Sequence, residues 1–217
     1  EDGAVSWELK PGTGVKAPEA GTEVPDPMQI AAVHIRNARI VHRDKRESSQ
    51  PWLVEDARVE STPGHRDVRV EARLSRHGRP LHVKARLDDL SALGTRDATT
   101  AGEVLFDWGD ARLEVRGRLP LDKDLGGMDV DAALDAKSLQ GLLAFFGFER
   151  GRTAPAHLKL KAVQAGGHVQ MRGIAARLGA LAVNGEGRIS TGKKKQVHAT
   201  LQAERFDWLK ALADAGG

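Results

Sequence analysis

The chain has 217 residues, of which 40% are hydrophobic and 29% are charged, a balance typical of one folded domain with room for two. It contains no Cys, which excludes disulfides, thiol nucleophiles and Cys-liganded metal sites. Lys and Arg outnumber Asp and Glu by only 33 to 30, and aromatic residues make up 4% with no Tyr. We therefore expect no nucleic-acid partner, because both the charge excess and the stacking rings are missing.

The first 27 residues differ from the rest of the chain. Residues 5–9 alternate like the end of a strand, and a linker rich in Pro and Gly follows to residue 27. The sequence thus divides into 1–27 and a folded segment, 28–217. Because the chain opens within a strand pattern at Glu1, we expect it to be a piece of a longer protein. No apolar run approaches the roughly 20 residues that span a bilayer.

From residue 30 onward the pattern is that of strands. An extended segment at 30–41 is followed by another that restarts at 52, and then apolar and charged residues alternate with a period of two. This alternation covers 68–74, 81–87, 104–108, 113–119, 128–134, 158–162, 169–171, 181–183 and 197–203. Only two short helices are predicted, one at 138–148 with Ser138 as N-cap and one beginning at 206.

One charged and one apolar face per strand predict a mainly β fold, an antiparallel meander forming a curved, groove-like half-barrel sheet. A self-packed sandwich is the alternative, although sandwich cores usually carry several large aromatic residues. The inward positions here are mostly Val, Leu, Ala and Gly, which suit flexible hydrocarbon. We expect the following residues to share one side and line a lipid groove: Val70, Ala72, Val83, Ala85, Val115, Val130, Ala132, Leu160, Met171, Val183, Val197 and Leu201.

Several segments resemble strands of the AsmA family. Residues 35–44 (IRNARIVHRD) are similar to its I-R-x-A/G-R-I-x-Y-R-D strand, with His42 in the place of an aromatic residue. Residues 138–143 (SLQGLL) resemble its short S-L-x-x-L helix. Residues 174–179 and 184–187 (IAARLG and NGEG) resemble one of its hairpins, and 205–209 (RFDWL) its closing motif. The resemblance, which also includes 74–81, 112–119 and Trp7, spans about residues 5–209.

The resemblance implies a function as well as a fold. AsmA-like proteins are periplasmic proteins of Gram-negative bacteria, held in the inner membrane by an N-terminal helix, and they look like bridge-type lipid carriers built of repeated β grooves. The chain would then be a groove segment that conducts phospholipid or another acyl-chain lipid between inner and outer membranes, in outer-membrane biogenesis. Its partners would be lipid, adjacent segments of the parent chain and, for the isolated piece, further copies of itself. The alternative is a periplasmic assembly scaffold that binds envelope proteins around a self-closed β core.

No pattern points to an enzyme, a cofactor or a metal. The eight His lack the spacing of metal ligands. The alternation places three acidic residues on the solvent-facing side of a predicted strand: Asp129, Asp131 and Asp135. The run Lys193, Lys194 and Lys195 is either a charged hairpin tip or a patch for anionic lipid headgroups. Residues 145–148, which hold three Phe, either pack the helix on the core or cap one end of the groove.

Overall fold

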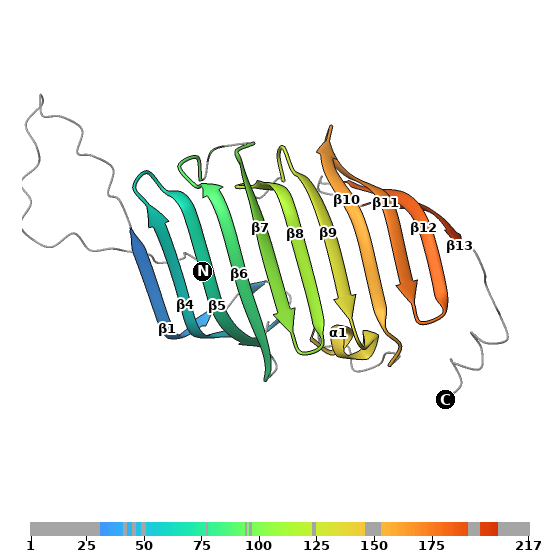
Figure 1. Ribbon diagram of the computed structural model, residues 1–217, viewed down its shortest axis with the longest axis horizontal. Helices are drawn as coiled ribbons and strands as arrows, with labels where there is room; N and C mark the ends of the chain where they lie inside the picture. Colours follow the sequence, from blue (N-terminus) through green and yellow to red (C-terminus); the bar gives the residue numbers. More distant parts are fainter. Residues whose placement is uncertain are drawn as a thin grey trace, which may run out of the picture.

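A computed structural model describes residues 31–40, 43–44, 47–48, 51–76, 78–93, 95, 97–122, 125–145, 153–190 and 196–203. Eleven strands form one antiparallel sheet, and each strand pairs with the next along the chain (Figure 1). The strands are β1 (Ala32–Ile40), β4 (Trp52–Thr62), β5 (Arg66–Arg76), β6 (Arg79–Asp89), β7 (Thr99–Trp108), β8 (Ala111–Pro120), β9 (Asp129–Ala136), β10 (Ala156–Ala165), β11 (His168–Leu178), β12 (Leu181–Ser190) and β13 (Val197–Ala203).

The meander is open, with β1 at one edge and β13 at the other. Between β1 and β4, the short strands β2 (Arg43–Asp44) and β3 (Glu47–Ser48) pair only with each other. The predicted mainly β, antiparallel meander is therefore confirmed, and the alternating segment 197–203 is the edge strand β13. Residues 5–9 and the helix predicted from 206 lie outside the described residues.

Tight turns connect the strands because glycine adopts positive φ at no steric cost. Gly166 and Gly167, with φ of 55° and 78°, join β10 to β11, as the favoured two-residue hairpin turn requires. Gly109, with φ of 62°, turns β7 into β8. Only residues 77 and 78 lie between β5 and β6, so both strands extend beyond the alternating segments predicted at 68–74 and 81–87.

The one helix among the described residues, α1 (Leu139–Phe145), follows β9. The backbone N–H of Gly141 donates to Ser138 Oγ at 3.2 Å, which confirms Ser138 as the N-cap. Leu139 packs against a buried cluster of Leu81, Trp108 and alanines from β8, β9 and β10. The helix thus covers the apolar face of the sheet only at one end of the strands (Figure 1).

Candidate lipid-binding face

The strand register aligns apolar residues from every strand into one continuous row. Each member lies opposite the next across all ten strand pairs, and every member is apolar. This central row consists, from β1 to β13, of Ile35, Ala57, Ala72, Val83, Phe106, Leu113, Leu134, Leu158, Ala176, Val183 and Ala203. Because side chains alternate between faces, all of them lie on one side of the sheet.

A second row runs beside the first from β1 to β10. It contains only Val, Ala and Leu, without an aromatic ring: Val33, Val59, Val70, Ala85, Val104, Val115, Ala132 and Leu160. A third row runs beside the second from Val68 of β5 through Leu87 of β6, and in it Gly102 lies opposite Gly117. A Cβ on Gly102 would lie 2.4 Å from the carbonyl oxygen of Arg86, so glycine is required for the close approach of β6 and β7.

The register places all twelve predicted groove residues on this face. Four of them pair directly as Ala72 with Val83 and Val70 with Ala85. The other eight lie on the same face, in these rows or in the rows beside them: Val115, Val130, Ala132, Leu160, Met171, Val183, Val197 and Leu201. That they contact lipid stays a prediction.

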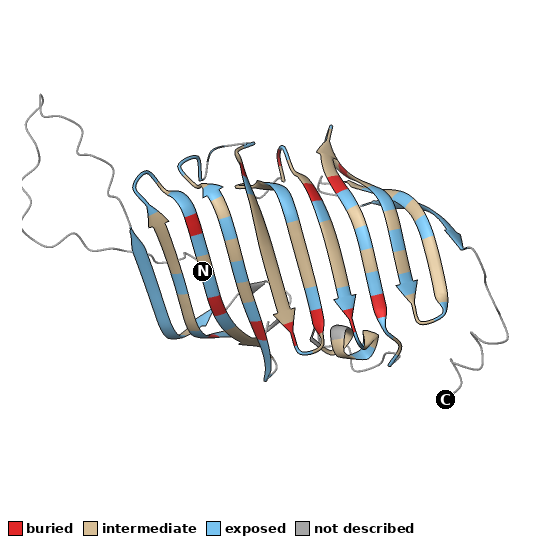
Figure 2. Ribbon diagram, viewed as in Figure 1, coloured by how far each residue is buried: buried red, intermediate tan, exposed pale blue. Residues whose placement is uncertain are grey.

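Among the described residues, the buried side chains of this face lie mainly toward the strand ends. Eight of them form two clusters, one beside α1 and one around Val130, Ala162 and Val169, and Val54, Val68 and Ala72 are buried outside these clusters. Most members of the rows are half-buried, and several pack against these clusters, such as Val83 and Val115, whereas Ala72 is buried. Figure 2 shows how buried, half-buried and exposed positions alternate along the strands. Toward the edges the apolar side chains become open to solvent, with Ile35 43% and Leu201 56% exposed. Apart from the eleven-stranded sheet, the described residues form one further sheet, the two-stranded pair of β2 and β3.

The opposite face carries charges in complementary cross-strand positions. On β9, Asp129 accepts from Arg118 of β8 at 3.3 Å and pairs with Lys161 of β10 at 3.1 Å. The pKa of Asp129 lies below its ordinary value of 3.8, mainly because of the hydrogen bond from Lys161 and then that from Arg118. On β4 the pKa of Asp56 is lowered likewise by His34, whose Nε2 lies 2.7 Å from Oδ1 of Asp56.

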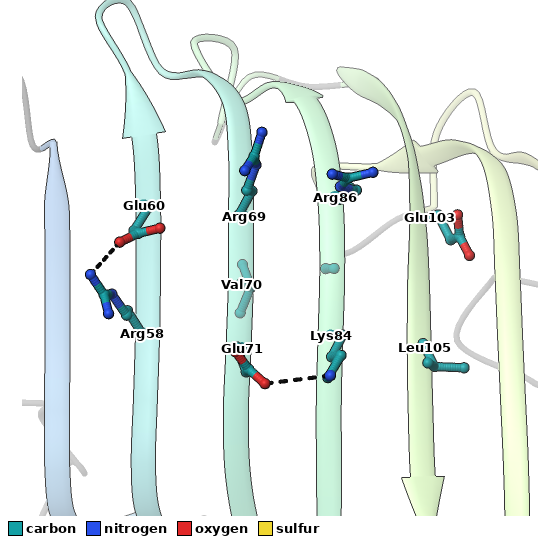
Figure 3. Close-up of a pocket in the computed structure, with 10 residues that line it drawn as sticks. Arg58, Glu60, Arg69, Val70, Glu71, Lys84, Arg86, Glu103 and Leu105 are labelled. Carbon is teal, nitrogen blue, oxygen red and sulfur yellow. Dashed lines mark ion pairs between the residues drawn. The ribbon is translucent and has the colours of Figure 1, made fainter.

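A shallow hollow of about 570 Å³ lies over β4 to β7 on this charged face (Figure 3). Charged side chains surround it, and ion pairs join Arg58 to Glu60 and Lys84 to Glu71. Seven of its ten lining side chains are charged, so this hollow is not part of the candidate lipid-binding face. No cluster of His, Asp or Glu among the described residues is arranged to hold a metal ion.

Two sets of predicted residues lie outside the described part of the chain. They are Lys193, Lys194 and Lys195, and the Phe residues beyond α1, so their roles stay predictions. Sequence reasoning overlooked the rim of the apolar face, where Trp52 of β4, Arg76 of β5 and Arg79 of β6 meet. The sequence contains the evidence for this rim. Arg76 lies two residues after Leu74, and Arg79 two residues before Leu81, which is the spacing of side chains on one face of a strand.

Comparison of the chain with protein-family models, with curated proteins and with solved structures finds no match. Within the described residues, no helix has the length and apolarity needed to cross a membrane.

Proposed function

We propose that this chain binds acyl-chain lipid, in particular phospholipid, on the open apolar face of its sheet and conducts it across the strands. The observation that carries the proposal is the central row, from Ile35 to Ala203, in which eleven successive strands each contribute an apolar residue. A polar residue at any of these positions would interrupt a hydrocarbon path, and none occurs.

The hydrophobic effect favours contact of this apolar face with lipid over contact with water. A monomeric protein rarely exposes a contiguous apolar surface of more than a few hundred Å² unless something binds there. Each methylene that leaves water for such a surface contributes about 0.8 kcal/mol. The aliphatic lining offers contact area without the fixed geometry that a ring-stacking ligand needs, which suits a flexible acyl chain.

The length of the row favours transfer over a single binding site. Eleven strands with neighbours about 4.8 Å apart give a row of about 48 Å along the sheet. An acyl chain occupies about 15 Å, half of a bilayer's hydrocarbon core. The face is therefore about three chains long. A path of this length agrees with the implication of the AsmA resemblance, that the segment works in the periplasm between inner and outer membranes.

A paired crosslinking experiment tests the proposal. The photoreactive residue p-benzoyl-phenylalanine replaces Val83 in the central row or, as a matched control, its neighbour Lys84 on the charged face. After irradiation in cells that express the chain, we expect a phospholipid adduct by mass spectrometry at position 83 and none at 84. Native mass spectrometry of the unmodified protein should show co-purified lipid. Equal labelling at the two positions, or no lipid at either, would refute the proposal.

The open edges support a second candidate, a scaffold that binds envelope proteins. The strands β1 and β13 each leave one row of backbone donors and acceptors without a strand partner among the described residues. In that case the crosslinks at position 83 would join the chain to protein rather than lipid. A closed core would need cover from outside the described strands, because these form an open sheet.

A further inference from the structure

Two arginines lie opposite each other at the rim of the apolar face. Arg76, the last residue of β5, pairs with Arg79, the first residue of β6. Arg76 shares the face of Leu74, and Arg79 that of Leu81, so both side chains belong to the apolar side and not to the charged one. Like charges directly opposite each other destabilise a sheet unless something compensates them.

The environment of Arg76 is unusual for a guanidinium group. Its Cζ lies 5.3 Å from the centre of the Trp52 ring, and the side chain is half-buried. Its Nε is buried and has no hydrogen-bond partner. A buried donor without an acceptor is costly, so the site is one acceptor short.

The charged face shows how the fold handles a comparable pair. Arg69 and Arg86 also lie opposite each other on β5 and β6, but there Arg69 Nη2 is 3.1 Å from Asp67 Oδ2 and both side chains are exposed. No carboxylate of the described residues forms an ion pair with Arg76 or Arg79. A ligand with a negative charge would compensate both cations at once.

We propose that Arg76 and Arg79, with Trp52, form a phosphate-binding site at the rim of the apolar face, which holds the headgroup of an anionic phospholipid whose acyl chains lie on that face. The guanidinium fork of arginine matches two phosphate oxygens, and its terminal nitrogens would be the donors, because Nε is closed to solvent. Trp52 joins a polar edge to an apolar body, as residues at lipid–water boundaries do. This inference rests on the proposed function and adds the class of headgroup.

Titration of the full chain with soluble short-chain lipids tests the site. The probes are dihexanoyl-phosphatidylglycerol below its micelle concentration, dihexanoylglycerol without phosphate, and inorganic phosphate without chains. The readouts are the dissociation constant and the NMR cross-peak of the Arg76 Nε–H, whose nitrogen is buried beside the rim. We expect the phosphatidylglycerol to bind most tightly and to shift this cross-peak.

Matched variants separate the rim from general electrostatics. Arg76→Gln should weaken phosphatidylglycerol binding about ten- to a hundredfold, the worth of hydrogen bonds to a charged group. Arg76→Lys, which keeps the charge and loses the fork, should also weaken it. Arg86→Gln, an equal loss of charge on the opposite face, should change it less than about twofold. Arg79→Gln, at an exposed position, provides the test if Arg76→Gln does not fold.

The outcomes distinguish the inference from the proposed function. If the wild type binds both lipids and Arg76→Gln binds phosphatidylglycerol as well as Arg86→Gln does, the headgroup site is refuted while the proposed function stands. If only inorganic phosphate binds, and its binding depends on Arg76, the rim is a site for free phosphate, and lipid binding is refuted. If no probe binds, both proposals are refuted.

Discussion

An aspartate placed at two positions of the apolar face distinguishes an open face from a closed core. Val68 on β5 is 1% exposed, near the strand end where Thr100 is also buried. Val83 on β6 is half-buried and lies in the central row. The same substitution, Val68→Asp or Val83→Asp, therefore meets two environments on one face of the same sheet.

The expected costs differ by several kcal/mol. At Val68 the change forfeits about 1.5–3 kcal/mol of apolar burial and adds about 1–3 kcal/mol for a polar group without a partner. The sum, about 3–6 kcal/mol, approaches the entire stability of many domains. At Val83 about half of the first contribution is lost, and the carboxylate still reaches water on an open face. We therefore expect a cost of about 1 kcal/mol there.

Urea unfolding followed by circular dichroism measures both costs. With a slope of about 2 kcal/mol per molar urea, Val83→Asp should lower the midpoint by about 0.5 M, whereas Val68→Asp should lower it by about 2 M or prevent folding. The folded Val83→Asp protein should also lose its co-purified lipid, as should Val115→Asp in the second row. Equal loss of stability at Val68 and Val83 would refute the open face, because it would mean that the central row is covered.

Three further predictions test the sheet itself. Gly102→Val should lower the free energy of unfolding in urea by about 3 kcal/mol or more, since a Cβ there would lie 2.4 Å from a neighbouring carbonyl oxygen. As a control, Gly64→Ala should cost about 1 kcal/mol, because Gly64 has open space around it and only its positive φ of 79° disfavours alanine. Because the pKa of Asp129 is lower in the folded state than its ordinary value of 3.8, its ionised carboxylate stabilises the fold above that value, and this contribution is lost as pH falls through the folded pKa. In Asp129→Asn the free energy of unfolding should therefore fall less steeply below about pH 4 than in the wild type. We expect the chain to self-associate through its open edges, which light scattering measures, and the double variant Ile35→Lys, Leu201→Lys should associate less. A wild type that stays monomeric at high concentration would contradict this prediction.

Strand alternation predicted parts of most strands, but it missed the residues beyond bulges and, in β12, those around Gly185 and Gly187. On β4 the pairing with β5 shifts between Val54 and Asp56, so the next side chain on the apolar face after Val54 is Ala57, three residues later instead of two. The extra residue conceals the second half of the strand from a search for period two. On β11 the same shift separates Met171 from Ile174, and the sequence predicted only the first part of that strand.

The candidate site was predictable as a list of residues but not as a continuous path. Period two assigns Val83 and Leu158 to a face within their own strands. That they belong to one row depends on the register of all the pairs between them, which turn lengths and bulges determine. The rim was missed for a related reason. The run from Arg76 to Pro80 is polar and contains Gly78, so it reads as a turn, whereas the strands extend to Arg76 and resume at Arg79.

The charged face helps to determine the register on which the apolar path depends. In the pairing of β8 with β9, Arg112 lies opposite Asp135. A shift by two residues would keep every side chain on its face, yet it would place Arg112 opposite Ala133 or Lys137. Each opposite-charge pair contributes about 0.2–1 kcal/mol, and like charges in such positions destabilise. The apolar residues alone determine the face but not the register, because Val, Leu and Ala tolerate many neighbours. The charge pairs on the solvent-facing side of the sheet therefore favour the strand register in which the apolar rows on the other side are continuous.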